Sequence, residues 1–227
     1  MDRFPSIGKA LRHPDGLLAA GGDLSTPRLL AAYAQGIFPW YEEGQPILWW
    51  SPDPRAVFLP DSIRISRSLR KTLRQNRFEI SFDRAFPEVV QGCAEPRSYG
   101  TGTWITSEMM DAYNRLHHEG HAHSIEVWDE SGLAGGLYGL AIGEVFFGES
   151  MFSRIRDASK VALVRLAEEL FVCGFVLIDC QVDSPHLQSL GATLLRRSKF
   201  LGLLKEHCAV PEPIDPWAQN TARIVHS

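Results

Sequence analysis

The sequence lacks several features, and each absence excludes or disfavours a class of protein. Its 227 residues include four cysteines with no CxxC spacing, so free thiols in a reducing compartment are expected and two disulfides are the less favoured alternative. No apolar run reaches the roughly 20 residues that a transmembrane helix needs, and residues 1–16 lack the apolar stretch of a signal peptide. The net charge of −4 argues against non-specific binding of polyanions. We therefore expect a cytoplasmic monomer without a membrane segment.

The central part of the chain, residues 143–182, is expected to fold as strand, polar loop, helix and strand: GEVFFGESMFSRIRDASKVALVRLAEELFVCGFVLIDCQV. Through residues 159–173 the apolar positions recur with the period of an amphipathic helix. Gly174 follows as a helix terminator. The flanking strands are predicted at residues 145–147 and 175–178.

Polar side chains follow both of these strands. Asp179 and Gln181 come after the second strand, two positions apart, so both face one side if the chain stays extended. Glu149 comes just after the first strand, where it can face the same crevice. A carboxylate and an amide at neighbouring strand ends predict a site. Cys180 is expected to point to the opposite face, into the core, which disfavours a nucleophilic pair of Cys180 and His186.

Residues 1–54 are rich in aromatic side chains, and we expect them to form a small domain, followed by a second domain over residues 55–227. Trp49 and Trp50 are neighbours in a predicted strand and cannot both face one core, so one of them needs a second partner surface. The stiff, polar Ser-Pro-Asp-Pro sequence at residues 51–54 marks the boundary between the two domains.

Residues 62–78 contain six basic side chains and no acidic one. Ser66 can cap a helix that begins at the next residue, and four basic side chains then share one face of that helix: Arg67, Arg70, Lys71 and Arg74. A solvated helix face is the plainer interpretation, but such a face usually mixes charges of both signs. The single sign favours contact with phosphates.

Two other segments indicate no function. His117 and His121 are four positions apart, as in some zinc sites. However, Gly120 interrupts the helix between them and no Glu follows His117 as HExxH requires, so we expect a structural or surface role and no metal. The segment from residue 211, PEPIDPW, is expected to be either extended or mobile.

Residues 123–152 predict a three-stranded antiparallel meander with turns at 129–132 and 143–144. A meander followed by a helix and a strand is the order of elements in acyl-CoA N-acyltransferase (GNAT) cores. The predicted fold class is therefore α+β, with a GNAT-like mixed-sheet domain preceded by a small N-terminal α/β domain. Such folds bind the pyrophosphate of coenzyme A with a Gly-rich loop before the main helix, whereas residues 152–158 contain no glycine. We expect neither coenzyme A nor another cofactor.

The sequence resembles the leucyl/phenylalanyl-tRNA–protein transferase family from residue 16 to about residue 192. The matching stretches are GLLAAGGDLS, YAQGIFPWY, ILWWSPDPRAV, ISRSLRK, GTWIT, AYNRLHHEGHAHSIEVW, FFGESMFSR, LIDCQV and HLQSLGA. This family transfers Leu or Phe, and Met less well, from aminoacyl-tRNA to the N-terminal Arg or Lys of a protein, which marks that protein for degradation. The resemblance implies the same reaction and the same partners for this chain.

The resemblance also implies roles for individual residues. Asp179 and Gln181 match the catalytic pair, and Glu149 and Asp179 match the acceptor-binding carboxylates. The pocket for the transferred side chain is implied at Leu137, Phe146, Ser153, Leu166, Leu170 and Ile178. The surroundings of the tRNA 3′ adenosine are implied at Tyr33, Trp40 and Trp104. Family members have Met at position 137 and Phe at positions 166 and 170, and these differences bear on the ranking of Leu against Phe.

The expected chemistry requires positioning more than acid or base strength. An aminoacyl ester is already activated, and an α-amine has an unperturbed pKa of about 7.7–8.0. Asp179 and Gln181 would hold the amine and help to deprotonate it. Two alternatives remain open. One is an ordinary N-acetyltransferase, disfavoured by the missing Gly-rich loop, and the other is a non-catalytic module that binds tRNA or an N-terminal Arg.

Overall fold

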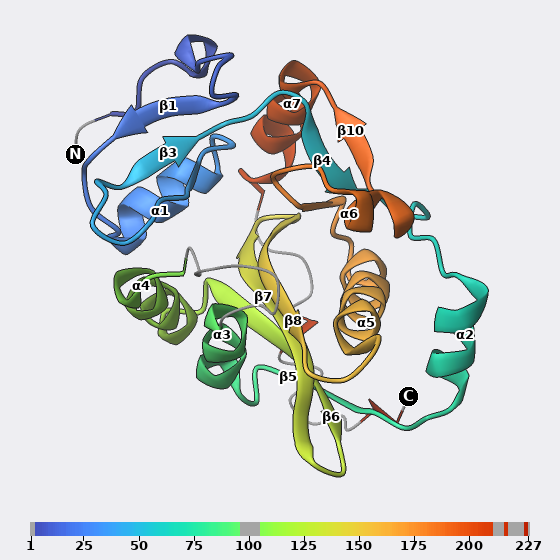
Figure 1. Cartoon of the computed structure of the whole chain (residues 1–227). Helices are drawn as coiled ribbons and strands as arrows, with labels where there is room; N and C mark the ends of the chain where they lie inside the picture. The colour runs from blue at the N-terminus through green and yellow to red at the C-terminus, as the bar shows by residue number, and fades with distance from the viewer. Residues whose placement is uncertain (1–2, 96–104, 211–215, 218–224, 227) are drawn as a thin grey trace.

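Two sheets organise the chain in its computed structural model, which describes residues 3–95, 105–210, 216–217 and 225–226 (Figure 1). The smaller sheet has the strand order β1-β3-β2, and the larger one has the order β10-β4-β9-β8-β7-β6-β5-β11. The smaller sheet consists of β1 (Leu17–Ala20), β2 (Phe38–Pro39) and β3 (Leu48–Trp50). The larger sheet consists of β4 (Arg55–Phe58), β5 (Glu79–Phe82), β6 (Ala122–Asp129), β7 (Gly132–Ile142), β8 (Val145–Ser153), β9 (Leu177–Asp179), β10 (Thr193–Leu195) and β11 (Val225–His226).

Helices cover both faces of the central strands. They are the 3₁₀ turn η1 (Ile7–Lys9), α1 (Thr26–Tyr33), α2 (Arg67–Arg74), α3 (Phe86–Ala94), α4 (Ser107–His118), α5 (Ala158–Val172), α6 (Pro185–Ser189) and α7 (Arg197–His207). In Figure 1, α3 and α4 lie on one side of β6, β7 and β8, and α5 lies on the other. Among the described residues, no helix has the length and apolar character that crossing a bilayer requires.

The predicted meander is confirmed, because β6 pairs with β7 and β7 pairs with β8, both antiparallel. β8 continues to Ser153, well past the predicted end at residue 147. The helix α5 then crosses over, and β9 pairs parallel with β8, so that Phe147 lies opposite Asp179. The pairing ends there while β8 runs on. The two strands therefore separate beside the residues predicted to form the site.

Two helices predicted from the sequence are confirmed, α2 and α5. Ser66 caps α2, with its hydroxyl accepting a hydrogen bond from the Leu69 N–H at 3.2 Å. The helix predicted over 159–173 is confirmed as α5, which follows Asp157 at a φ of 68° and ends before Gly174 at a φ of 97°. Glycine adopts this left-handed conformation without a steric penalty.

The two neighbouring tryptophans of β3 have different partners, as predicted. The Trp49 indole is buried and donates to the Gly21 carbonyl oxygen at 2.8 Å. The Trp50 indole donates to the Trp40 carbonyl oxygen at 2.6 Å, and the two rings pack at 5.6 Å. The smaller sheet lies within residues 1–54, but its buried side chains share one hydrophobic cluster with α3, α4 and α7.

Trp217 is docked on the larger sheet, a role that the sequence did not indicate, while residues 211–215 before it lie outside the described residues. Trp217 is 4% exposed and stacks on His123 at 4.4 Å. Its ring also lies 5.8 Å from the rings of Phe82 and Phe146. A single tryptophan in a proline-rich stretch has no periodicity, so its burial is not visible in the sequence.

Replacement of Trp217 by Ala should lower the free energy of unfolding by about 3–5 kcal/mol, because a buried ring leaves a cavity against three other rings. Urea unfolding followed by circular dichroism measures this loss. The matched control is Trp40→Ala, since Trp40 is 44% exposed and its removal should cost far less. Equal losses in the two variants would contradict the docking of Trp217.

Candidate active site

A cavity of about 710 Å³ opens where β8 and β9 separate. Glu149 and Gln181 line it, together with the apolar side chains of Leu137, Leu163 and Ile178. The cavity is therefore amphipathic, with a carboxylate and an amide beside an aliphatic wall. This composition is typical of a small-molecule binding site.

A β-bulge in β8 sets the direction of Glu149. Tyr138 of β7 pairs with Ser150, and the next residue, Gly139, pairs with Gly148, so Glu149 is the extra residue of the longer strand. A bulge interrupts the alternation of side chains and redirects the extra one. Opposite the bulge, a Cβ at Gly139 would lie 2.2 Å from the Phe147 carbonyl oxygen, so this close approach requires glycine.

Asp179 is fully buried in an ion pair at the end of β9. The Nε and Nη2 atoms of Arg55 donate to its two carboxylate oxygens at 2.8 and 2.7 Å. The guanidinium group also donates to the Gly36 carbonyl oxygen at 3.3 Å and lies over the rings of Phe38 and Phe200. The sequence placed the Asp179 carboxylate in the site, whereas Asp179 is 0% exposed and is not among the residues that line the cavity.

The chain turns at Gln181, where the sequence assumed that it stays extended. Gln181 has a φ of 55°, and its N–H donates to Asp179 Oδ1 at 3.0 Å. Its side-chain amide donates to Glu149 Oε1, also at 3.0 Å. Because a carboxylate can only accept, the amide nitrogen must face Glu149. The carbonyl oxygen of the Gln181 side chain is therefore left for another donor.

Glu149 has a second partner on the side away from Gln181. The Tyr113 hydroxyl donates to Glu149 Oε2 at 2.6 Å, and the Tyr33 hydroxyl lies 2.5 Å from that of Tyr113. Burial raises the pKa of Glu149 to about 7, an effect that the two hydroxyls oppose and that the charge of Asp179 reinforces. A carboxyl group that titrates near neutrality in a cavity is a typical acid–base candidate.

Three of the six residues predicted to surround the transferred side chain line the cavity: Leu137, Ser153 and Ile178. The other three are buried in the core and do not line it: Phe146, Leu166 and Leu170. On α5 the lining residue is Leu163, which lies one turn nearer the N-terminal end of this helix than Leu166. Helical periodicity marked these leucines as a buried face but could not show which turn borders the cavity.

The residues predicted around the tRNA 3′ adenosine lie in different settings. Tyr33 is fully buried, and its hydroxyl lies beside that of Tyr113, so its ring is not available for stacking on a base. Trp40 is 44% exposed and packs against Trp50. Trp104 lies outside the described residues.

Cys180 packs against the core cluster, as predicted, but it also lines the cavity beside Gln181, so it does not lie wholly on the opposite face. The turn at Gln181 removes the alternation on which that prediction depended. Burial raises the pKa of the Cys180 thiol, with the Asp179 charge as a further cause. The reactive thiolate form is therefore disfavoured.

His117 has a structural role, as predicted. Its ring stacks on that of Phe86 at 4.2 Å, and its Nδ1 atom lies 2.8 Å from the Ala122 carbonyl oxygen. His117 therefore connects α4 to α3 and to the start of β6.

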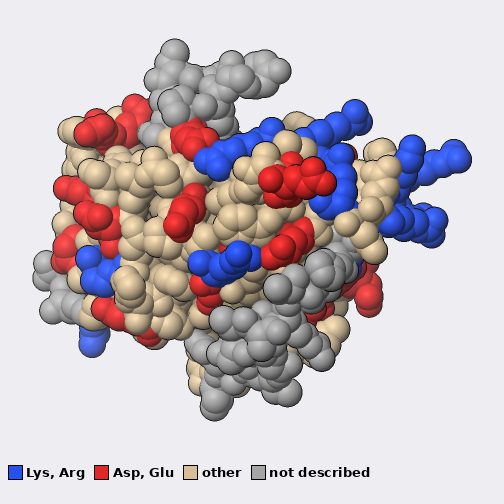
Figure 2. Space-filling model, turned by 90° about the horizontal axis from the view of Figure 1, so that it is seen from below, with Lys and Arg blue, Asp and Glu red and all other residues tan. Residues whose placement is uncertain are grey.

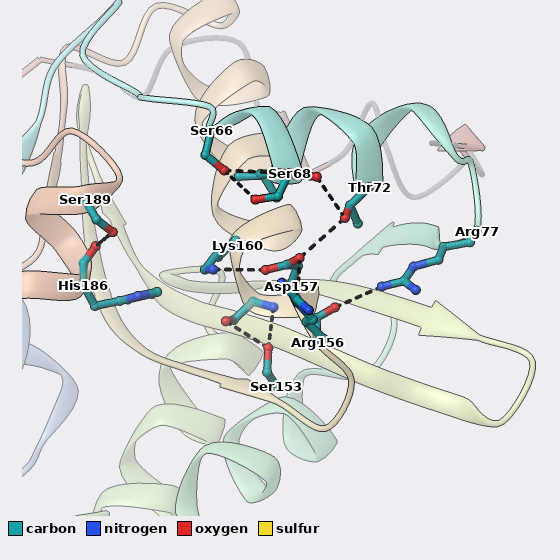
Figure 3. A network of polar contacts seen from close by, with 12 residues as sticks. Ser66, Ser68, Thr72, Arg77, Ser153, Arg156, Asp157, Lys160, His186 and Ser189 are labelled. Carbon is teal, nitrogen blue, oxygen red and sulfur yellow. Dashed lines mark hydrogen bonds and ion pairs between the residues drawn. The ribbon is translucent and has the colours of Figure 1, made fainter.

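The predicted basic face of α2 is exposed to solvent: Arg67, Arg70, Lys71 and Arg74. Figure 2 shows a group of Lys and Arg side chains that project from one edge of the molecule. The opposite side of α2 contacts the start of α5, where the Thr72 hydroxyl lies 3.5 Å from Asp157 (Figure 3). Just beyond the helix, Arg77 donates to the Arg156 carbonyl oxygen at 3.0 Å. The helix is thus fixed by its neutral side and presents its charged side outward.

Fold and cavity together define a class of protein. A meander, a crossover helix and a parallel strand that separates beside a carboxylate and an amide make a GNAT-like acyltransferase fold, preceded here by a small N-terminal domain. Among solved structures, FemX is similar, with a TM-score of 0.46 and 11% identity over 75% of this chain and 66% of that one.

Sequence comparisons define the family. The family described as leucyl/phenylalanyl-tRNA protein transferase matches residues 57–205, and its N-terminal domain matches residues 22–53. The chain is 60% identical to the leucyl/phenylalanyl-tRNA–protein transferase of Stutzerimonas stutzeri (strain A1501), over 93% of this chain and 94% of that relative. It is 57% identical to that of Chromobacterium violaceum, over 94% and 92%. The chain therefore belongs to the leucyl/phenylalanyl-tRNA–protein transferase family and has its transferase function.

Replacement of Asp179 by Asn should lower the free energy of unfolding by about 3–5 kcal/mol, because the buried Arg55 guanidinium loses its only charge partner among the described residues. Denaturant unfolding measures the change. Asp111→Asn is the matched control, since it removes the same charge from an exposed position of α4 and should change stability by no more than about 0.5 kcal/mol. An unfolding curve of Asp179→Asn that coincides with the parent curve would contradict the role assigned to the ion pair.

Proposed function

We propose that the chain transfers Leu or Phe, and Met less well, from aminoacyl-tRNA to the N-terminal Arg or Lys of acceptor proteins. The transfer forms a peptide bond and creates a degradation signal. The observation that carries the proposal is the contact of Glu149 and Gln181 in a cavity with an aliphatic wall. One part of this site suits an acceptor amine, and the other suits an apolar side chain. Because the ester is already activated, the reaction needs no cofactor or metal.

Gln181 is the proposed catalytic residue that receives the attacking amine. Its side-chain carbonyl oxygen can accept a hydrogen bond from the amine, because the amide nitrogen is bound to Glu149. Asp179, the other member of the predicted pair, acts through Gln181, since its Oδ1 atom accepts the Gln181 N–H. We therefore propose a positioning role for Asp179. The predicted acceptor-binding role is kept for Glu149, whose carboxylate can hold the positive charge of the acceptor.

The apolar wall is the proposed contact for the transferred side chain. Leu137, Leu163 and Ile178 offer aliphatic surface, which rejects a charged side chain because its desolvation is uncompensated. Discrimination among apolar side chains is weaker, since a methylene group changes selectivity by only about 1–3 kcal/mol. Acceptance of Leu, Phe and Met by one site is consistent with such a wall.

The function is tested by mixing phenylalanyl-tRNA with a peptide that begins with Arg, and by detecting the peptide extended by Phe with mass spectrometry. Gln181→Ala should reduce the rate roughly 100-fold, because correct orientation of the amine is lost. Gln188→Ala is the matched control, since Gln188 is exposed on α6 and should leave the rate unchanged. Isoleucyl-tRNA should give little product.

Two outcomes of the same assay would contradict the proposal. Binding of charged tRNA or of the peptide without any product would support the non-catalytic module. An acetylated peptide formed from acetyl-CoA would support an ordinary N-acetyltransferase.

The exposed face of α2 is the proposed contact for the tRNA backbone. Its four basic side chains, named above, form no ion pair with any other described residue. They are therefore free to neutralise phosphates, and each such contact releases condensed counterions. We further propose that residues 1–54 and 55–227 are two domains, and that the protein is a cytoplasmic monomer.

Binding of tRNA should weaken steeply as salt is raised. Reversal of charge at Arg70 and Arg74 together should flatten the slope of log K against log salt by about 1 to 2, because two phosphate contacts are lost. The control with the same change of charge is Arg196→Glu with Lys199→Glu, at exposed positions in the N-cap and first turn of α7. Puromycin, which carries no tRNA body, should bind all variants equally. An equal loss of puromycin binding in the α2 variant would mean that α2 is structural.

A further inference from the structure

Three tyrosines from three elements surround the inner side of Glu149. Tyr33 comes from α1, Tyr113 from α4 and Tyr138 from β7, and all three side chains are fully buried. Two of them form a continuous line of hydrogen bonds to the carboxylate, through contacts of 2.5 and 2.6 Å. The third, Tyr138, packs edge-on against Tyr113 at 5.3 Å, and its hydroxyl has no hydrogen-bond partner among the described residues.

The direction of the hydrogen bonds in this line is fixed by the carboxylate. An ionised Glu149 only accepts, so the Tyr113 hydroxyl must donate to it. The Tyr113 oxygen is then the acceptor for the Tyr33 hydroxyl. Burial raises the pKa of both phenols, so both stay neutral donors. A donor that itself accepts a hydrogen bond is polarised and donates more strongly.

Glu149 is thus held from both sides, with its Oε2 atom bound to Tyr113 and its Oε1 atom bound to Gln181. The titratable groups that line the cavity besides Glu149 are Cys93, Glu95, Arg154, Cys180 and His186, and the groups that lie close to Glu149 are Tyr33, Arg55, Tyr138 and Asp179. Glu95 and Arg154 form an ion pair with each other. Arg55 and Asp179 neutralise each other in their ion pair. Tyr33 and Tyr113 are neutral, so they act on the Glu149 carboxylate through directed hydrogen bonds and not through charge.

We infer that Glu149 is the proton acceptor for the acceptor's α-ammonium group, and that Tyr113, oriented by Tyr33, is the positioning residue that keeps Glu149 ionised and correctly aimed. The inference rests on the proposed function. It goes beyond the holding of positive charge assigned to Glu149 above, because a proton is transferred. It also gives Tyr33 a role inside the protein in place of the predicted contact with adenosine.

The step balances as follows. The α-ammonium group gives one proton to the Glu149 carboxylate and becomes a neutral amine, whose lone pair attacks the ester carbon. A carbon–nitrogen bond forms, and the ester bond to the ribose oxygen of the tRNA breaks. The nitrogen loses a second proton, and the leaving ribose oxygen takes up one proton. Glu149 releases its proton to solvent, so one proton is set free in each turnover and no oxidant or reductant is required.

The test compares two tyrosine variants through their pH profiles. The value of kcat/KM for phenylalanyl-tRNA and an Arg-starting peptide is measured from pH 6 to 8.5, with uncatalysed ester hydrolysis subtracted. Dividing the kcat/KM of the parent by that of the variant at each pH cancels the effect of amine ionisation, because this effect is the same in both proteins. In Tyr113→Phe the ionised carboxylate loses a donor, so the pKa of Glu149 rises above about 7 and the acid limb moves to higher pH.

If the acid limb of Tyr113→Phe shifts by about one pH unit, kcat/KM falls roughly tenfold below the parent value at pH 6 but less than about twofold at pH 8.5. A merely structural defect would lower the rate at every pH. The matched control is Tyr138→Phe, which removes a buried hydroxyl that has no partner among the described residues and should leave the acid limb in place. Tyr33→Phe should shift the limb in the same direction but less, and it serves as the second variant if Tyr113→Phe does not fold.

Glu149→Gln should lose transfer across the whole pH range. The inference is overturned if the acid limb of the Tyr113 and Tyr33 variants stays at the parent position, or if Tyr138→Phe shifts it equally. Failure of the parent protein to transfer phenylalanine at any pH is a different result, since it would contradict the proposed function itself.

Discussion

The buried ion pair of Arg55 and Asp179 is the contact on which the site depends. Removal of two charges from water costs several kcal/mol for each ion, so the pair is tolerated only when all its hydrogen bonds are made. Arg55 also contacts Gly36 and Phe38 from the N-terminal section and Phe200 from α7. Three distant segments must therefore be in place before the guanidinium group is satisfied. The main effect of the ion pair is therefore to select one folded arrangement of these segments over alternative arrangements, and its net contribution to the free energy of unfolding is smaller.

The geometry of the cavity follows from this pair through two local irregularities. Asp179 accepts the N–H of Gln181 and so supports a left-handed conformation that costs about 1 kcal/mol or more in a residue other than glycine. That turn aims the amide of Gln181 at Glu149, which the β-bulge of β8 directs from the other side. A regular pair of strands would alternate its side chains and keep these two groups apart. The irregularities thus create the contact between amide and carboxylate.

The sequence predicted the elements of the fold because their signals are local. Helical periodicity, the Ser66 cap and the turns of the meander each involve residues a few positions apart, and the resulting elements are confirmed. Contacts between distant residues leave no such signal. Arg55 and Asp179 are 124 positions apart, and Tyr113 occupies an apolar helix face, where it is indistinguishable from a core residue. The prediction of an extended conformation at Gln181 was wrong because no local sequence pattern indicates a left-handed residue there.

At the start of α5, groups that could bind a coenzyme pyrophosphate are engaged within the protein. A helix N-terminus binds an anion through free N–H groups. Here the Ser159 N–H donates to the Ser153 hydroxyl at 2.8 Å, and the Ala158 N–H donates to the Ile155 carbonyl oxygen at 3.1 Å. The half-turn before the helix also carries the Asp157 carboxylate, which pairs with Lys160 at 3.0 Å, so that this cation is engaged as well. A donor with phosphates would be held at another surface. α2 lies directly beside this helix end (Figure 3), and its arginines are exposed. In the proposed function, a tRNA donor contacts that surface with its backbone while its aminoacyl end enters the cavity.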